Sequence, residues 1–119
     1  GGKEPNCSAE HVSAAAAELV SRGLPQKLMV DFSHANSRKD YRRQMEVADD
    51  IAGQLAAGNA NIFGVMVESH LVEGRQDLKP GCELTYGQSV TDACIGWDDT
   101  EKLLTTLANA VKARRARKD

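Results

Sequence analysis

Apolar residues along the chain occur in two patterns. Where they recur every three or four positions they predict three helices, and where they form short continuous runs they predict two strands. The first helix is expected over residues 9–22, an Ala-rich segment. Ser8 is placed to cap its beginning, and Gly23 and Pro25 are placed to end it. The apolar stripe of a second helix recurs every three or four positions, at Tyr41, Met45, Ala48, Ala52 and Leu55.

Possible capping boxes precede the second and third helices. Ser37 followed by Asp40 predicts the start of the second helix, and Gly58 its end. Asp98 followed by Glu101 predicts the start of the third. The apolar residues expected to carry this third helix are Leu103, Leu104, Leu107 and Val111.

Two short apolar runs, residues 28–32 and 62–67, are the predicted strands. Because an amphipathic helix separates them, they are typical of a parallel strand–helix–strand unit buried on both faces. Residues 69–97 show no sustained periodicity and are expected to form a long loop, either functional or disordered. The order of elements alone also fits a small flavodoxin-like α/β binding domain.

Length and composition indicate one soluble domain, and the order of helices and strands makes it α/β. The chain has 119 residues, of which 41% are hydrophobic. The longest apolar run is too short to cross a bilayer, and no signal-like stretch opens the sequence, so we expect a cytoplasmic protein without membrane contact. Three cysteines without close spacing favour reduced thiols over a disulfide framework.

Charge is divided unevenly. Residues 112–119 hold five of the 15 basic residues and one of the 17 acidic ones, giving +4 for this tail, −6 for the rest and −2 for the whole chain. An acidic body with only 4% aromatic residues argues against nucleic-acid binding. The tail is expected to complement the dipole of the last helix and then to fray in solvent.

Candidate chemistry lies where the two strands end, since ligands of parallel α/β proteins bind at the carboxyl ends of strands. Residues 31–37 leave the first strand, and residues 68–70 leave the second. Adjacent parallel strands would bring His34 near Glu68, a donor pair that suits a divalent transition metal. The alternatives are a hydrogen-bonded histidine and a solvated glutamate, because no HExxH or paired CxxC motif is present.

Two other sites are less favoured. A hydrolytic triad of Asp31, Ser33 and His34 conflicts with strand geometry, because neighbouring residues of a regular strand point to opposite faces. The segment Gly1-Gly2-Lys3 could contribute to a phosphate-binding turn, but a plain loop fits such a short signal better.

Four segments together resemble one known family: GGKEPN at the start, LMVDFSHANS at 28–37, GVMVESHLVEG at 64–74 and SVTDACIGW at 89–97. They are similar to the bacterial type I 3-deoxy-D-arabino-heptulosonate 7-phosphate (DAHP) synthases. The resemblance extends from Gly1 to about Arg115 and concerns the C-terminal third of such enzymes. It implies a (β/α)₈ TIM barrel, of which this chain would supply the last two strands and the last three helices.

The family resemblance also implies an activity and a metal. These enzymes condense phosphoenolpyruvate with erythrose 4-phosphate and require a divalent ion held by a Cys, a His, a Glu and an Asp. The matching positions are His34, Glu68 and Asp92, with Asp92 also a candidate proton relay. The family cysteine has no counterpart here, and Cys94 is not assigned as a ligand. Such a donor set tolerates Mn, Fe, Co or Zn, so the sequence does not identify the metal.

As a barrel piece, the chain divides into a Gly-rich loop and helix (1–23), a strand–helix unit (24–58), a strand, long loop and helix (59–115), and the basic tail (112–119). The arginines and lysines that hold substrate phosphates in the family lie upstream, so substrate-binding residues are unassigned and the isolated chain is expected to be inactive. The parent enzyme is expected to form homo-oligomers. The alternative is a non-catalytic binding or assembly module that retains the metal-site residues.

Overall fold

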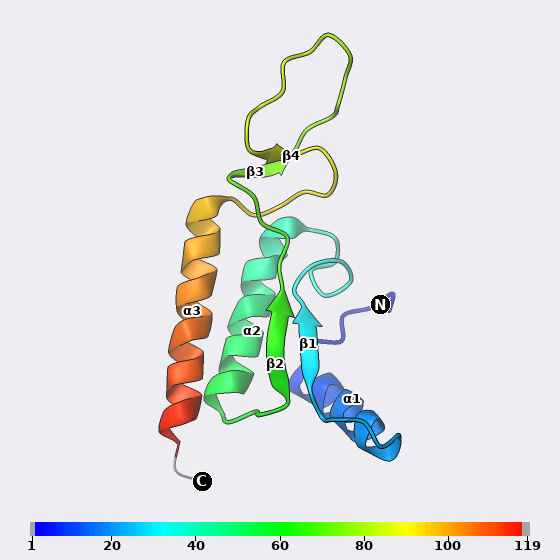
Figure 1. Cartoon of the computed structure of the whole chain (residues 1–119), viewed down its shortest axis with the longest axis vertical. Helices are drawn as coiled ribbons and strands as arrows, with labels where there is room; N and C mark the ends of the chain where they lie inside the picture. The colour runs from blue at the N-terminus through cyan, green and yellow to red at the C-terminus, as the bar shows by residue number, and fades with distance from the viewer. Residues whose placement is uncertain (1, 118–119) are drawn as a thin grey trace.

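The computed structural model describes residues 2–117, which form a mixed α/β arrangement (Figure 1). In chain order the elements are α1 (Ala9–Ser21), β1 (Leu28–Asp31), the 3₁₀ turn η1 (Tyr41–Arg43), α2 (Gln44–Ala56), β2 (Ile62–Met66), β3 (Val72–Arg75), β4 (Gln88–Ser89) and α3 (Trp97–Ala116).

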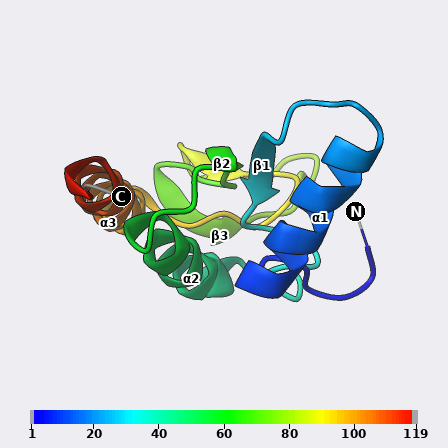
Figure 2. The same cartoon turned by 90° about the horizontal axis from the view of Figure 1, so that it is seen from below.

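The centre of the molecule is the predicted strand–helix–strand unit. β1 and β2 pair in parallel, with Leu28 opposite Ile62 and Asp31 opposite Met66. Helix α2, which connects them, packs alongside α3, while α1 contacts β1 (Figures 1 and 2). Both strands run in the same direction, so their carboxyl ends lie together at one edge of the sheet (Figure 1).

The core lies between this sheet and the helices. Phe32, Ile51, Ile95 and Leu103 are its largest fully buried apolar side chains. Side chains alternate along β1, where Val30 is buried and its neighbour Met29 is 60% exposed. Phe63 of β2 is also exposed, at 65%. The predicted burial of this strand pair on both faces is therefore wrong for the described residues, because helices cover the face that carries Val30 and leave Met29 exposed (Figure 2).

The first helix begins and ends as its sequence predicts. The Ser8 side chain accepts a hydrogen bond from the backbone N–H of His11, which satisfies a donor in the first turn. After the C-cap Arg22, Gly23 adopts φ +70°, the left-handed conformation that favours glycine at a helix end. Gly58 follows α2 in the same way, with φ +108°.

Both predicted capping boxes are wrong. Ser37 donates to the carbonyl of His34, and Asp40 instead caps η1 by accepting from the N–H of Arg42. At α3 the N-cap is Gly96, which has no side chain to offer, and the Glu101 carboxylate accepts from the indole of Trp97 at 2.9 Å.

The predicted long loop contains structure of its own. β3 and β4 pair in parallel, and single bridges join Ser69 to Ile95 and Gly74 to Cys94. The segment that carries β3 and β4 projects beyond the carboxyl end of the central sheet (Figure 1). Its strands are too short and too exposed to produce a hydrophobic period, which is why the sequence pattern does not reveal them.

The basic tail begins as predicted, with Arg114 and Arg115 in the last turn of α3, but its residues 112–116 are helical and not frayed. The Arg114 guanidinium donates to the carbonyl oxygens of Asn59 and Ile62, at 2.9 and 3.2 Å, and so ties the helix end to the start of β2. Residues 118–119 of the predicted tail lie outside the described residues. Within residues 2–117, no helix combines the length and apolar character needed to cross a membrane.

Candidate metal centre

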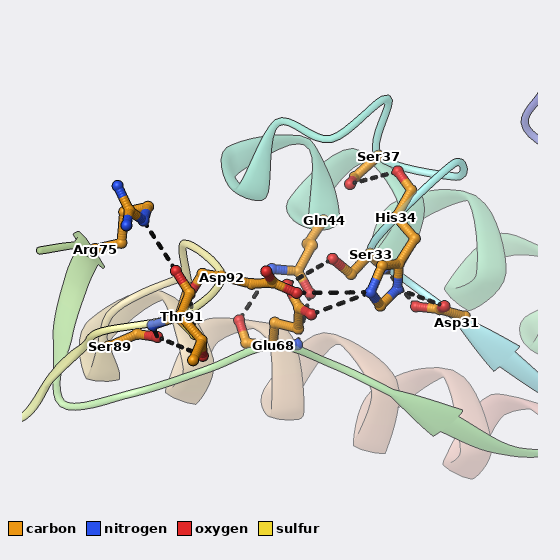
Figure 3. A network of polar contacts seen from close by, with 11 residues as sticks. Asp31, Ser33, His34, Ser37, Gln44, Glu68, Arg75, Ser89, Thr91 and Asp92 are labelled. Carbon is orange, nitrogen blue, oxygen red and sulfur yellow. Dashed lines mark hydrogen bonds and ion pairs between the residues drawn. The ribbon is translucent and has the colours of Figure 1, made fainter. Parts of the chain in front are cut away.

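Three potential metal ligands converge where β1 and β2 end (Figure 3). His34 lies just after β1, Glu68 just after β2, and Asp92 between β4 and α3. The His34 Nε2 atom lies 3.3 Å from Glu68 Oε1 and 3.8 Å from Asp92 Oδ2. The expected approach of His34 to Glu68 is therefore present, and the long segment adds Asp92 to the same cluster.

A tight turn after β1 places His34. The Asp31 carboxylate accepts a hydrogen bond from the backbone N–H of Ser33 at 2.8 Å, and the Asn36 side chain donates to the Asp31 carbonyl, also at 2.8 Å. His34 itself has φ +54°, a left-handed conformation that is uncommon for residues other than glycine. This turn ends the strand and directs the imidazole along the edge of the sheet toward Glu68.

The imidazole is oriented by Asp31. Its Nδ1 lies 2.8 Å from Asp31 Oδ2, so Nδ1 carries the hydrogen and Nε2 faces the two other candidate ligands. This hydrogen bond, together with the negative charges of Asp31, Glu68 and Asp92, raises the pKa of His34. In its neutral form the ring has an Nε2 lone pair available to a metal.

The Glu68 carboxylate is partly buried and shared between two neighbours. Ser33 Oγ donates to Oε2 at 2.8 Å, which leaves Oε1 facing His34. The rejected Asp31–Ser33–His34 triad is also absent in space, because Ser33 bonds Glu68 while His34 bonds Asp31. Ser33 therefore holds a carboxylate in place instead of sharing a proton with the histidine.

Asp92 is the most exposed of the three candidates, with 70% of its side chain accessible. Its segment is held by neighbouring contacts: Arg75 Nε donates to the Thr91 carbonyl at 2.9 Å, and the Thr91 N–H donates to Ser89 Oγ (Figure 3). The Cys94 thiol donates to the Asp92 carbonyl. Asp92 lines a cleft of about 390 Å³ that His34 also borders.

The donor set fits a divalent first-row metal. The three ligand atoms lie within 4.8 Å of one another. Nitrogen and oxygen ligands sit ~2.0–2.2 Å from such ions and hence about 3–4 Å from each other, which matches the 3.3 and 3.8 Å from His34 Nε2 to the Glu68 and Asp92 carboxylates. Among the described residues, the cluster around His34 contains no cysteine, since Cys94 is not one of its members. Three protein donors leave coordination positions open for a further ligand or a substrate oxygen.

Sequence reasoning misses the residues that support these candidate ligands. The sequence presents Ser33 only as a possible nucleophile, whereas its hydrogen bond to Glu68 joins residues 35 positions apart. Gln44, fully buried at the start of α2, contacts the main chain of Glu68. A single polar residue beside the apolar stripe of a helix gives no signal of such a contact, because the contact depends on how the helix packs against the sheet.

Comparison with known proteins gives consistent matches. The model of the DAHP synthetase I family matches residues 1–105. Phospho-2-dehydro-3-deoxyheptonate aldolase, Phe-sensitive, of Escherichia coli K12 is 60% identical over 115 residues, covering 97% of this chain and 33% of that protein. The Trp-sensitive form from the same strain is 50% identical over 114 residues, covering 96% of this chain and 33% of that protein.

A solved structure agrees with these relatives. The phospho-2-dehydro-3-deoxyheptonate aldolase of Francisella tularensis SCHU S4 superposes with a TM-score of 0.88 at 48% identity, over 95% of this chain and 33% of that one. The chain therefore spans about a third of the length of the relatives that it matches.

Proposed function

Because this chain belongs to the DAHP synthetase I family, we propose that it supplies three ligands to the metal centre of a DAHP synthase. The proposed ligands are His34, Glu68 and Asp92. The observation that carries the proposal is the convergence of their donor atoms within 4.8 Å, from three separate segments of the chain. The parent enzyme would condense phosphoenolpyruvate with erythrose 4-phosphate, the first step of the shikimate pathway.

The proposed architecture is the C-terminal part of a (β/α)₈ barrel, contributing the last two strands and the last three helices. Support comes from the parallel pairing of β1 with β2 and from the helices that cover one face of this pair. The division into segments 1–23, 24–58, 59–115 and 112–119 belongs to this proposal. So do a cytoplasmic location and a homo-oligomeric parent, for which the family resemblance is the support.

Each proposed ligand has a distinct task. A bound divalent ion would supply Lewis-acid polarisation of the aldehyde oxygen of erythrose 4-phosphate. His34 presents Nε2 because Asp31 holds Nδ1, and Glu68 presents Oε1 because Ser33 holds Oε2. Asp92 lines the cleft beside His34, and its proposed second role is to relay a proton. Mn, Fe, Co and Zn all suit this mixture of imidazole and carboxylate donors.

Titration of the 119-residue chain with Mn²⁺ tests the ligand assignment. His34→Ala should weaken binding by at least about tenfold, because it removes one of three ligands. His11→Ala is the matched control, since His11 is an exposed histidine of α1 whose imidazole contacts Ser8. Equal affinities of the His34→Ala variant and the unaltered chain would overturn the assignment.

A second experiment separates the enzyme from the alternative, a non-catalytic binding or assembly module. The isolated chain should release no phosphate from the two substrates with Mn²⁺, because the family's cysteine ligand and phosphate-binding residues have no counterpart in it. In a chimera, this chain would replace the matching third of the E. coli Phe-sensitive relative. Turnover by the chimera supports the enzyme, whereas a folded, metal-binding but inactive chimera supports the module.

A further inference from the structure

We propose that Gln44 is a positioning residue of the candidate metal centre, which fixes the main chain of Glu68 so that its carboxylate faces His34. The inference rests on the metal-binding role proposed above. It concerns a residue that lies on a helix, outside the strand-end segments that carry the ligands, and whose side chain bonds main-chain groups rather than the metal ligand atoms.

Gln44 is the first residue of α2 and is completely buried. Its side-chain oxygen accepts a hydrogen bond from the backbone N–H of Glu68 at 2.8 Å, and its side-chain nitrogen donates to the carbonyl of the same residue at 3.0 Å. The nitrogen also donates to the Tyr41 carbonyl at 3.2 Å, which anchors the amide to the turn before the helix. Both polar groups of the Glu68 main chain are thus engaged by one side chain (Figure 3).

These bonds are needed because β1 turns away before Glu68. The last pairing of the two strands joins Asp31 to Met66, followed by a hydrogen bond from Phe32 to the Met66 carbonyl. From Ser33 onward the chain enters the turn that places His34, so Glu68 loses the neighbour that a longer strand would provide. A glutamine amide carries donor and acceptor groups, as a peptide group does, and takes the place of that neighbour.

The contact bears on the metal centre through the orientation of Glu68. On the other side, the Ile95 N–H donates to the same Glu68 carbonyl at 3.0 Å. With its main chain held by Gln44 and Ile95 and its Oε2 held by Ser33, Glu68 has its remaining oxygen directed at His34 Nε2. Buried partners that orient a ligand typically change metal affinity about 10–100-fold when they are removed.

The test compares Gln44→Met with Gln54→Met in the full 119-residue chain. Gln54 is a matched control: it lies on the same helix, is 8% exposed, and donates to the Cys7 carbonyl and to Asp50 rather than to the metal-site segments. Both changes keep side-chain length and remove a buried amide, so similar losses of stability are expected. The two readouts are the Mn²⁺ dissociation constant and the hydrogen-exchange rate of the Glu68 amide.

Gln44→Met should weaken Mn²⁺ binding about 10–100-fold and accelerate exchange at Glu68, whereas Gln54→Met should change the affinity by less than about threefold. The proposal is overturned if both variants change the Mn²⁺ affinity equally. It is also overturned if Gln44→Met leaves both the affinity and the exchange rate at Glu68 unchanged. If the unaltered chain binds no Mn²⁺, the metal proposal fails, and exchange at Glu68 alone decides whether Gln44 fixes this main chain. Should Gln44→Met not fold, Gln44→Asn replaces it, since its amide is one methylene too short to reach both groups.

Discussion

At the scale of single residues, the side chains of two candidate ligands are oriented in different ways. His34 is oriented by Asp31, three residues earlier in the same turn. Glu68 is oriented by Ser33 and Gln44, which lie 35 and 24 positions away. The histidine therefore depends on local turn geometry, while the glutamate depends on the packing of β1 and α2 against β2.

The dependence of His34 on Asp31 gives a prediction. Asp31→Ala should weaken Mn²⁺ binding about 10–100-fold, because the imidazole loses the hydrogen bond that holds its Nδ1. Calorimetric titration measures the change, and Asp49→Ala, at an exposed position of α2, is the control. An affinity within about threefold of the unaltered chain would show that the turn orients His34 without Asp31.

How far the site is predictable from sequence depends on the residue. His34 and Glu68 follow from the rule that ligands gather at the carboxyl ends of parallel strands. Asp92 does not follow from this rule, because it lies in a segment without periodicity, and the family resemblance alone identifies it. Ser33 and Gln44 as supports require the folded structure, since their contacts cross between elements that sequence spacing does not relate.

At the scale of elements, the predicted helix interiors are accurate, whereas the predicted starts of α2 and α3 are not. The apolar stripe of α2 is largely buried, as its helical spacing predicts. Its start is displaced because Asp40 caps a 3₁₀ turn ahead of the helix. Hydrophobic spacing reports which face is buried over several turns, whereas a boundary depends on one or two hydrogen bonds that compete with loop contacts.

Replacing two glycines by alanine should change the stability of the chain in opposite directions. Gly87, before β4, has φ +80°, and a Cβ there would lie 2.9 Å from Leu71 Cβ, so Gly87→Ala should destabilise the chain by about 1–3 kcal/mol. Gly53 lies inside α2, and a Cβ added there would meet nothing within 4 Å, so Gly53→Ala should stabilise the chain by about 0.5–1 kcal/mol.

Urea unfolding of both variants beside the unaltered chain measures these changes in the free energy of unfolding. Each variant is the control for the other, because the chemical substitution is identical and only the surroundings differ. If Gly87→Ala stabilises the chain, then the backbone at Gly87 does not lie as close to Leu71 as the structure indicates.

At the scale of the whole molecule, the chain is extended and its central sheet is small. Its principal extents are 58 × 31 × 19 Å and its radius of gyration is 16.5 Å. A compact domain of this length would have a radius of gyration of about 13–14 Å. Within the described residues, β1 and β2 pair only with each other, so each has one edge without a strand partner. A groove of about 460 Å³ lies between α1 and β1.

Unpaired strand edges beside exposed apolar side chains favour association with other chains. Met29 of β1 and Phe63 of β2 are 60% and 65% exposed. We therefore expect the purified chain to self-associate as its concentration rises, and sedimentation velocity measures this. Met29→Lys with Phe63→Lys should shift the distribution toward monomer, because the two added charges repel a second copy and would have to leave water where it binds.

Leu104→Lys is the matched control, since Leu104 is 54% exposed but lies on α3, away from the sheet. If this control suppresses association as strongly as the double variant, the sheet face is not the contact. A chain that stays monomeric at every concentration would mean that the small sheet is stable with its edges in water. Association through the sheet would instead agree with a chain whose strands require further strands beside them, as the proposed barrel does.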